Sequence, residues 1–233
     1  MKEILNFINE KLVLNKETKV FYPTTKVELY NAIKKILKTE GPDANLNVIN
    51  TSEVTDMSSL FTLFKPSEIG DIKIDLWDTS NVTNMSHMFK GCDKFTGDVS
   101  KWNVSKVKST ESMFEGCTLF NCDLKKWKTS NVTNMGRMFY NCTAFTSDLS
   151  KWDVSNVTSM TNMFNTCSNF ESNLENWKVS KCKSFNAMFN DCVKFKCDLN
   201  KWGVDITKAT TNWMFWGSGI KGDDIPAWYN KKK

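Results

Sequence analysis

The chain has 233 residues, of which 40% are hydrophobic and 24% are charged, and its formal net charge is +5. This composition is that of a soluble globular protein with enough apolar residues to bury a core. It excludes a membrane span, because no apolar run approaches the roughly 18 residues of a spanning helix, and the mild charge does not by itself indicate nucleic-acid binding.

The first 45 residues are expected to form an N-terminal helical cap. Residues 3–11 predict a short helix, and residues 19–23 predict a strand or an extended segment. A longer helix is expected to start at Thr25, which forms a capping-box pattern with Glu28, and to end at Gly41. Its apolar stripe consists of Leu29, Ile33, Ile36 and Leu37.

Residues 46–220 contain a tandem repeat. The sequence SNVTNMSHMF at residues 80–89 returns as SNVTNMGRMF at residues 130–139. Six tryptophans each lie 25 residues after the last: Trp77, Trp102, Trp127, Trp152, Trp177 and Trp202. Short units of this kind cannot bury their apolar faces alone, so the period predicts stacking into a solenoid. The seven units begin at Leu46, Ile74, Val99, Leu124, Leu149, Leu174 and Leu199.

Each unit is expected to contain a strand and a helical turn. Trp152 and Val154 stand at alternate positions, so residues 151–155 predict a short strand, followed by a corner at Ser155-Asn156. A second apolar set has the i, i+3, i+4, i+7 spacing of one helical face. It consists of Met160, Met163, Phe164 and Cys167. The expected fold class is therefore α/β, a solenoid with a parallel sheet of short strands on one face and short helical turns on the other.

Residues 221–233 are expected to form a C-terminal cap and a basic tail. The apolar residues Ile220, Ile225, Trp228 and Tyr229 can shield the last unit, and the chain ends in three lysines at residues 231–233. Solenoids need such lids because their terminal units otherwise expose core.

The repeat resembles that of a known family. The sequence WDVSNVTSMTNMFNTC at residues 152–167 and its copies are similar to the 25-residue repeat of BspA-like leucine-rich-repeat surface proteins, also found in mycoplasmal lipoproteins. The resemblance covers about residues 24–228 and includes the helix before the repeats. It implies a leucine-rich-repeat-like solenoid, a cell-surface or secreted location, and adhesion or protein binding. The N-terminus shows no signal peptide or lipobox cysteine, which instead predicts a cytosolic location.

Five cysteines occupy one repeat position and are expected to form a buried column of reduced thiols: Cys92, Cys117, Cys142, Cys167 and Cys192. Disulfides are less expected, because parallel side chains in register seldom offer the required geometry. The pairs Cys117/Cys122 and Cys192/Cys197 have a C-x4-C spacing but no accompanying histidine, so no metal site is predicted.

No catalytic constellation is recognisable. The single histidine, His87, is expected to face solvent, and there is no nucleophile motif or phosphate-binding loop, so we expect neither an enzyme nor a cofactor. Six Asn-x-Ser/Thr triplets are interpreted as turn-forming residues rather than glycan acceptors: Asn50, Asn81, Asn103, Asn131, Asn141 and Asn156.

The residues beside each tryptophan are the candidate binding site, because they should point away from the core. They are Lys101, Asn103, Lys126, Lys128, Lys151, Asp153, Asn176, Lys178, Lys201 and Gly203. Such a lysine-rich face predicts a non-enzymatic module that binds an acidic protein or an anionic glycan. Alternatively, the lysines only keep the exposed face soluble, or the protein is a structural or assembly component of a larger particle or envelope. Binding would then involve the ends of the stack or the other side, near His87, Glu111, Arg137 and Asn162.

Overall fold

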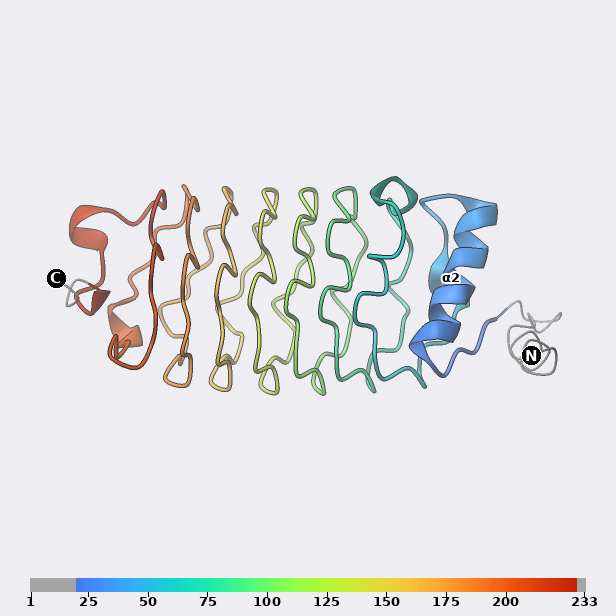
Figure 1. Cartoon of the computed structure of the whole chain (residues 1–233), viewed down its shortest axis with the longest axis horizontal. Helices are drawn as coiled ribbons and strands as arrows, with labels where there is room; N and C mark the ends of the chain where they lie inside the picture. Colours follow the sequence, from blue (N-terminus) through green and yellow to red (C-terminus); the bar gives the residue numbers. More distant parts are fainter. Residues whose placement is uncertain (1–19, 230–233) are drawn as a thin grey trace.

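The structure is a computed structural model that describes residues 20–229. The chain winds into stacked coils that form an elongated body, with α2 at one end and the C-terminal segment at the other (Figure 1). Within the described residues, α2 (Lys26–Glu40) is the one α-helix. Four short 3-10 helices accompany it: η1 (Leu46–Val48), η2 (Pro66–Glu68), η3 (Asn200–Trp202) and η4 (Gly222–Asp224). The helix predicted at residues 3–11 and the basic tail at residues 231–233 lie outside the described residues.

The predicted helix after Thr25 is confirmed. The Thr25 hydroxyl accepts a hydrogen bond from the Glu28 N–H at 3.2 Å, and the helix ends at Gly41, which has a φ of +83°. The Glu28 carboxylate accepts from the N–H of Thr24 at 2.7 Å, one residue before the donor of a capping box. The apolar face of α2 is buried, and the helix lies over the first coil (Figure 1).

The expected α/β solenoid with a parallel sheet is wrong. Residues 20–229 contain no strand longer than an isolated bridge, and neighbouring units are joined by single parallel bridges. The predicted strand at residues 151–155 has no bridge, whereas Ser159 pairs with Asn134 and Ser184. The leucine-rich-repeat solenoid implied by the family resemblance requires a strand sheet, so that expectation is wrong as well.

Most backbone hydrogen bonds between units run instead through the segment that was expected to be helical. In one unit, the N–H groups of Met135, Arg137, Phe139 and Asn141 donate to carbonyls of the next unit at 2.8 to 3.0 Å. The acceptors are the carbonyls of Ser159, Thr161, Met163 and Asn165. We call residues 135–141 and their counterparts in the other units the ladder segment.

The peptide groups of the ladder segment all point the same way. The carbonyls of Asn134, Gly136, Met138 and Tyr140 accept from N–H groups of the preceding unit at 2.8 to 3.1 Å. The N–H on the other side of each of these peptide bonds donates to the following unit. Carbonyls therefore face the N-terminal end of the stack, and N–H groups face the C-terminal end.

Tight turns with left-handed residues explain why the ladder segment resembles a helix in sequence. The N–H groups of Met138 and Tyr140 donate to the carbonyls of Met135 and Arg137, three residues earlier. However, φ is +55° at Arg137 and +57° at Asn141, and a residue in this region interrupts a right-handed helix. The three-residue turns place apolar side chains on one side without forming a helix.

The predicted burial of the repeated apolar residues is confirmed. Trp102, Trp127, Trp152 and Trp177 are each 4% exposed. The rings of Trp127 and Trp152 stack with centroids 6.1 Å apart. Each indole N–H donates to the first carbonyl of the preceding unit, as from Trp152 Nε1 to the Leu124 carbonyl at 2.9 Å. A second column, of phenylalanines, runs beside the tryptophans, with centroids of Phe139 and Phe164 5.7 Å apart.

The C-terminal segment covers the interior of the last unit. Trp228 continues the tryptophan column, and its Nε1 donates to the Leu199 carbonyl at 2.8 Å. The ring of Tyr229 meets Phe215 edge-on at 5.0 Å, and Ile220 is buried. The predicted shielding of the last unit is therefore confirmed for these residues, and Ile225 packs against the same core.

Candidate functional site

The cysteine column packs the core and offers no reactive group. All eight cysteines are free thiols, and the five of the repeat position are buried. The Cys142 thiol donates to the Phe114 carbonyl at 3.0 Å, and Cys167 and Cys192 donate to the equivalent phenylalanine carbonyls. Burial raises the pKa of Cys142, so the thiol stays neutral and is a poor nucleophile.

The structure offers no metal site in residues 20–229, where no three His, Cys, Asp or Glu side chains come together in a suitable group. His87 is half-buried rather than fully exposed, and its φ is +59°. A search of the same residues for a helix long and apolar enough to cross a membrane found none.

Five of the six triplet asparagines make side-chain hydrogen bonds at the turns, as the sequence suggested. The side-chain amides of Asn81, Asn131 and Asn156 donate to backbone carbonyls of the preceding unit at 2.6 to 2.8 Å. The Asn103 side chain instead accepts from the N–H of Ser105 at 3.1 Å. These amides therefore fix the corners of the coils.

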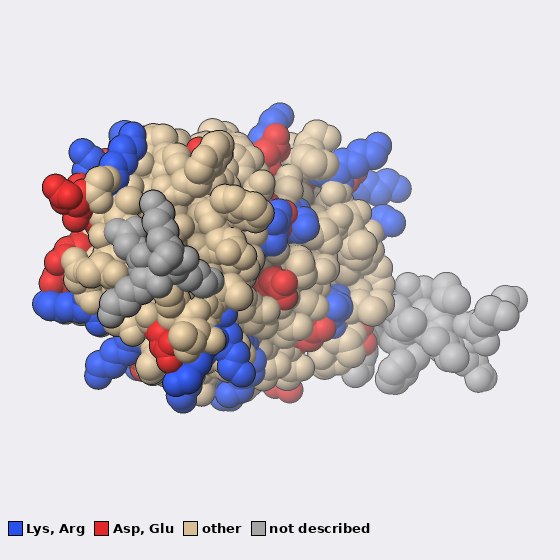
Figure 2. All heavy atoms as spheres, turned by 60° about the vertical axis from the view of Figure 1, so that its left-hand side comes forward, with Lys and Arg blue, Asp and Glu red and all other residues tan. Residues whose placement is uncertain are grey.

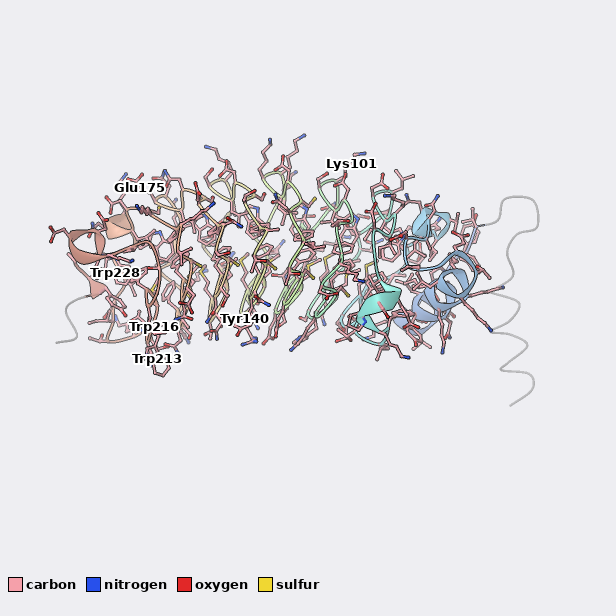
Figure 3. The ribbon with its side chains drawn as sticks, turned by 90° about the horizontal axis from the view of Figure 1, so that it is seen from above. Lys101, Tyr140, Glu175, Trp213, Trp216 and Trp228 are labelled. Atoms are coloured by element: carbon pink, nitrogen blue, oxygen red, sulfur yellow. The ribbon has the colours of Figure 1, made fainter. Side chains whose placement is uncertain are left out.

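The residues beside each tryptophan all point outward. The first set, Lys101, Lys126, Lys151, Asn176 and Lys201, is exposed throughout, and we call it the lysine row. The second set, Asn103, Lys128, Asp153, Lys178 and Gly203, is exposed as well. Figure 3 shows Lys101 on the side of the stack opposite Tyr140, Trp213 and Trp216.

The charge of the lysine row is only partly balanced. In the part of the chain that the structure describes, Lys101, Lys126 and Lys151 have no salt bridge, whereas Lys201 pairs with Glu175 at 2.7 Å. Aspartates border the row in the adjacent turns. Hydrogen bonds from Ser150, with a smaller contribution from the Lys151 charge, lower the pKa of Asp148 and keep it ionised. Hydrogen bonds within their own turns likewise lower the pKa values of Asp98, Asp123 and Asp198.

A shallow hollow lies where Asn176 interrupts the lysine row. It has a volume of about 360 Å³, and Asn176, Lys178 and Lys201 are among the residues that line it. The hollow joins the two outward sets of residues at this point. It is open to solvent and is lined by both polar and apolar side chains, and an open hollow of this kind suits contact with a macromolecule rather than enclosure of a small molecule.

Sequence reasoning missed a charge cluster on the opposite side. The Arg137 guanidinium donates to both Glu115 carboxylate oxygens, at 3.0 and 2.8 Å, and stacks 4.1 Å from the Tyr140 ring. Lys90 lies 3.3 Å from the same carboxylate. Burial alone would raise the pKa of Glu115, but hydrogen bonds from Arg137 and Ser112 and the two cations outweigh it and lower the pKa to about 2. The signal was a set of opposite charges in neighbouring repeats.

Two exposed tryptophans at the end of the stack were also missed. Trp213 and Trp216 are 71% and 66% exposed, and Figure 3 places them on the same side as Tyr140. Trp213 takes the repeat position that holds His87, Arg137 and Ala187 in other units. The departure of WMFWG from the repeat pattern was the signal that could have identified them.

Comparison with known proteins supplies a family and no individual relative. Neither the curated proteins nor the solved structures gave a match to the chain. One family matches over residues 28–149 and again over residues 120–228, which together span most of the sequence. The two matches overlap, as expected for a tandem repeat read in two registers. The chain belongs to the family described as Mycoplasma protein of unknown function, DUF285.

Proposed function

We propose that the chain is a non-enzymatic binding module that holds an extended acidic partner along the lysine row. The observation that supports the proposal is the run of Lys101, Lys126 and Lys151. They are exposed in three consecutive units and have no salt bridge among the described residues. Because the units are stacked in register, the fields of these lysines add over the face and attract a chain of anionic groups.

The partner's chemistry follows from the bordering aspartates. Asp98, Asp123 and Asp148 carry negative charge beside the row, so the face is not uniformly positive. A partner must therefore follow the lysines in register, which favours a linear molecule with repeated anionic groups, such as an acidic protein segment or an anionic glycan. The resemblance of the repeat to BspA-like surface proteins supports a binding or adhesive role.

A charge-reversal variant tests this proposal. In the row variant, Lys101, Lys126, Lys151 and Lys201 are all changed to Glu. Binding to an immobilised sulfated glycan and to a poly-glutamate peptide is measured at low and moderate salt. We expect the parent chain to bind at least one probe, with affinity falling as salt rises, and the row variant to bind neither. The two probes distinguish a glycan partner from an acidic peptide.

A matched control separates the row from total charge. The control variant changes Lys94, Lys183, Lys196 and Lys221, which are exposed outside the row, to Glu and alters the net charge equally. Exposed substitutions of this kind usually shift stability by only tenths of a kcal/mol each, which thermal unfolding will verify. Equal binding losses in both variants, or full binding by the folded row variant, would contradict the proposal.

A further inference from the structure

The C-terminal end of the stack presents a row of backbone donors. In the sixth unit, the N–H groups of Phe185, Ala187, Phe189 and Asp191 donate to carbonyls of the seventh unit at 2.7 to 2.9 Å. The corresponding donors of the seventh unit belong to Thr211, Trp213, Phe215 and Gly217. Within residues 20–229 these four N–H groups have no acceptor. They carry the positive ends of the aligned peptide dipoles and have no following unit to pair with.

The N-terminal end is closed in a different way. There α2 lies along the first unit: Lys26 binds the Asp56 carboxylate at 3.0 Å, and Tyr30 packs on Phe64 with centroids 4.9 Å apart. A second copy therefore cannot add its first unit to the open donors, because α2 covers its carbonyl edge. Two C-terminal ends cannot pair either, since donors would face donors.

The side chains at the open edge indicate a contact surface. Trp213 and Trp216 flank the donor row, and both indoles are largely exposed. Trp213 also has a φ of +54°, a conformation that is strained for a bulky residue and that polar or small residues occupy in other units. Tryptophans are prominent among the residues that dominate binding energy at interfaces. In Figure 2, the coloured part of the C-terminal end is largely uncharged toward its centre, and charged side chains lie around its rim.

We propose that this end binds a peptide segment of another polypeptide, which pairs with the open N–H groups as an additional unit. The segment would offer alternate carbonyls to the donors, as each unit of the stack does for the unit before it, and apolar side chains to Trp213 and Trp216. Trp228 and Tyr229 already cover Phe215, so the partner pairs with the open backbone edge and does not need to cover exposed core residues. This surface is distinct from the lysine row, and the inference does not depend on the proposed function.

A peptide copied from the repeat is a suitable probe. Residues 130–141, SNVTNMGRMFYN, contain the carbonyls of Asn134, Gly136, Met138 and Tyr140, which accept from the preceding unit in the stack. Hydrogen exchange of the full-length chain is followed by NMR with and without this peptide. The amides of Trp213, Phe215 and Gly217 should exchange quickly alone and about tenfold or more slowly with peptide. A scrambled peptide should leave them unchanged.

Substitution of the tryptophans completes the test. A variant with Trp213→Ala and Trp216→Ala should lose about tenfold or more in peptide affinity, whereas Leu63→Ala with Leu119→Ala, at exposed apolar sites elsewhere, should not. Slow exchange of the three amides without peptide would overturn the inference. Equal protection by the scrambled peptide, or unchanged affinity of the tryptophan variant, would overturn it as well.

Discussion

Each tryptophan of the repeat ties two units together through one side chain. The Trp152 ring stacks on that of Trp127, and its indole N–H binds the Leu124 carbonyl of the preceding unit. Its backbone N–H donates to the Leu149 carbonyl at 3.0 Å, within its own unit. The indole therefore makes the link between units that backbone pairing would make in a sheet. This explains how residues 152–154 can be regular in sequence and still form no strand.

Removal of one indole should be strongly destabilising. Trp152→Ala deletes a buried ring and leaves the Leu124 carbonyl with the Trp127 backbone N–H as its remaining donor, so we expect a loss of about 3–5 kcal/mol in the free energy of unfolding. Trp152→Phe keeps most of the ring but removes the N–H, and should cost about 1–3 kcal/mol. Urea unfolding followed by circular dichroism measures both. A Trp152→Phe variant as stable as the parent chain would contradict a separate role for the indole hydrogen bond.

The Glu115 cluster should make stability depend on pH. The carboxyl has a pKa of about 2 in the folded protein, against an ordinary value of 4.5. Its contribution to stability is therefore complete above about pH 4.5 and is lost as the pH falls toward 2. Glu115→Gln removes this contribution. In urea unfolding at a series of pH values, the parent chain should be the more stable at pH 7, and the gap should shrink between pH 4.5 and 2. A gap that is constant over this range would contradict the role given to the carboxylate.

At the scale of the elements, the sequence identified what is buried but not how the backbone pairs. The apolar columns and the cap helix follow from periodicity, because side-chain burial imposes the repeat directly. The strand was wrongly placed because buried residues also alternate at Trp152 and Val154 when an indole hydrogen bond, rather than backbone pairing, joins the two units. The prediction of a helical turn was wrong because the backbone is left-handed at positions such as Arg137 and Ala187. These positions are not occupied by glycine, so no sequence signal marked them. The outward position of the lysine row was predictable, since it follows from the buried tryptophans beside it.

The left-handed positions of the ladder segment can be tested at Ala187, where φ is +50°. Ala187→Val places a β-branched side chain in this region and should destabilise the protein by about 1–2 kcal/mol. Ala187→Gly suits the conformation but gains freedom in the unfolded chain, so its net change should stay within about 1 kcal/mol. Urea unfolding of both variants provides the comparison. A Val variant as stable as the Gly variant would argue against the left-handed turn.

At the scale of the whole molecule, the two sides of the stack are built differently. The ladder segment carries most of the backbone bonds between units and the Glu115 cluster, while the opposite side carries the lysine row. The stack holds its outward side chains in register over several units, because each unit is fixed by its neighbours. A rigid row of this kind can bind an extended partner without ordering loops on binding, which lowers the entropic cost of association.

Titration of the isotopically labelled chain with a sulfated oligosaccharide or a poly-glutamate peptide, followed by amide NMR, tests the proposed binding face most directly. We expect one of these probes to shift signals of residues beside Trp102, Trp127 and Trp152, including Lys101, Lys126 and Lys151, and the shifts to weaken with salt. Signals of the ladder segment should change little. Shifts confined to the ladder segment, or none with either probe at low salt, would contradict the account.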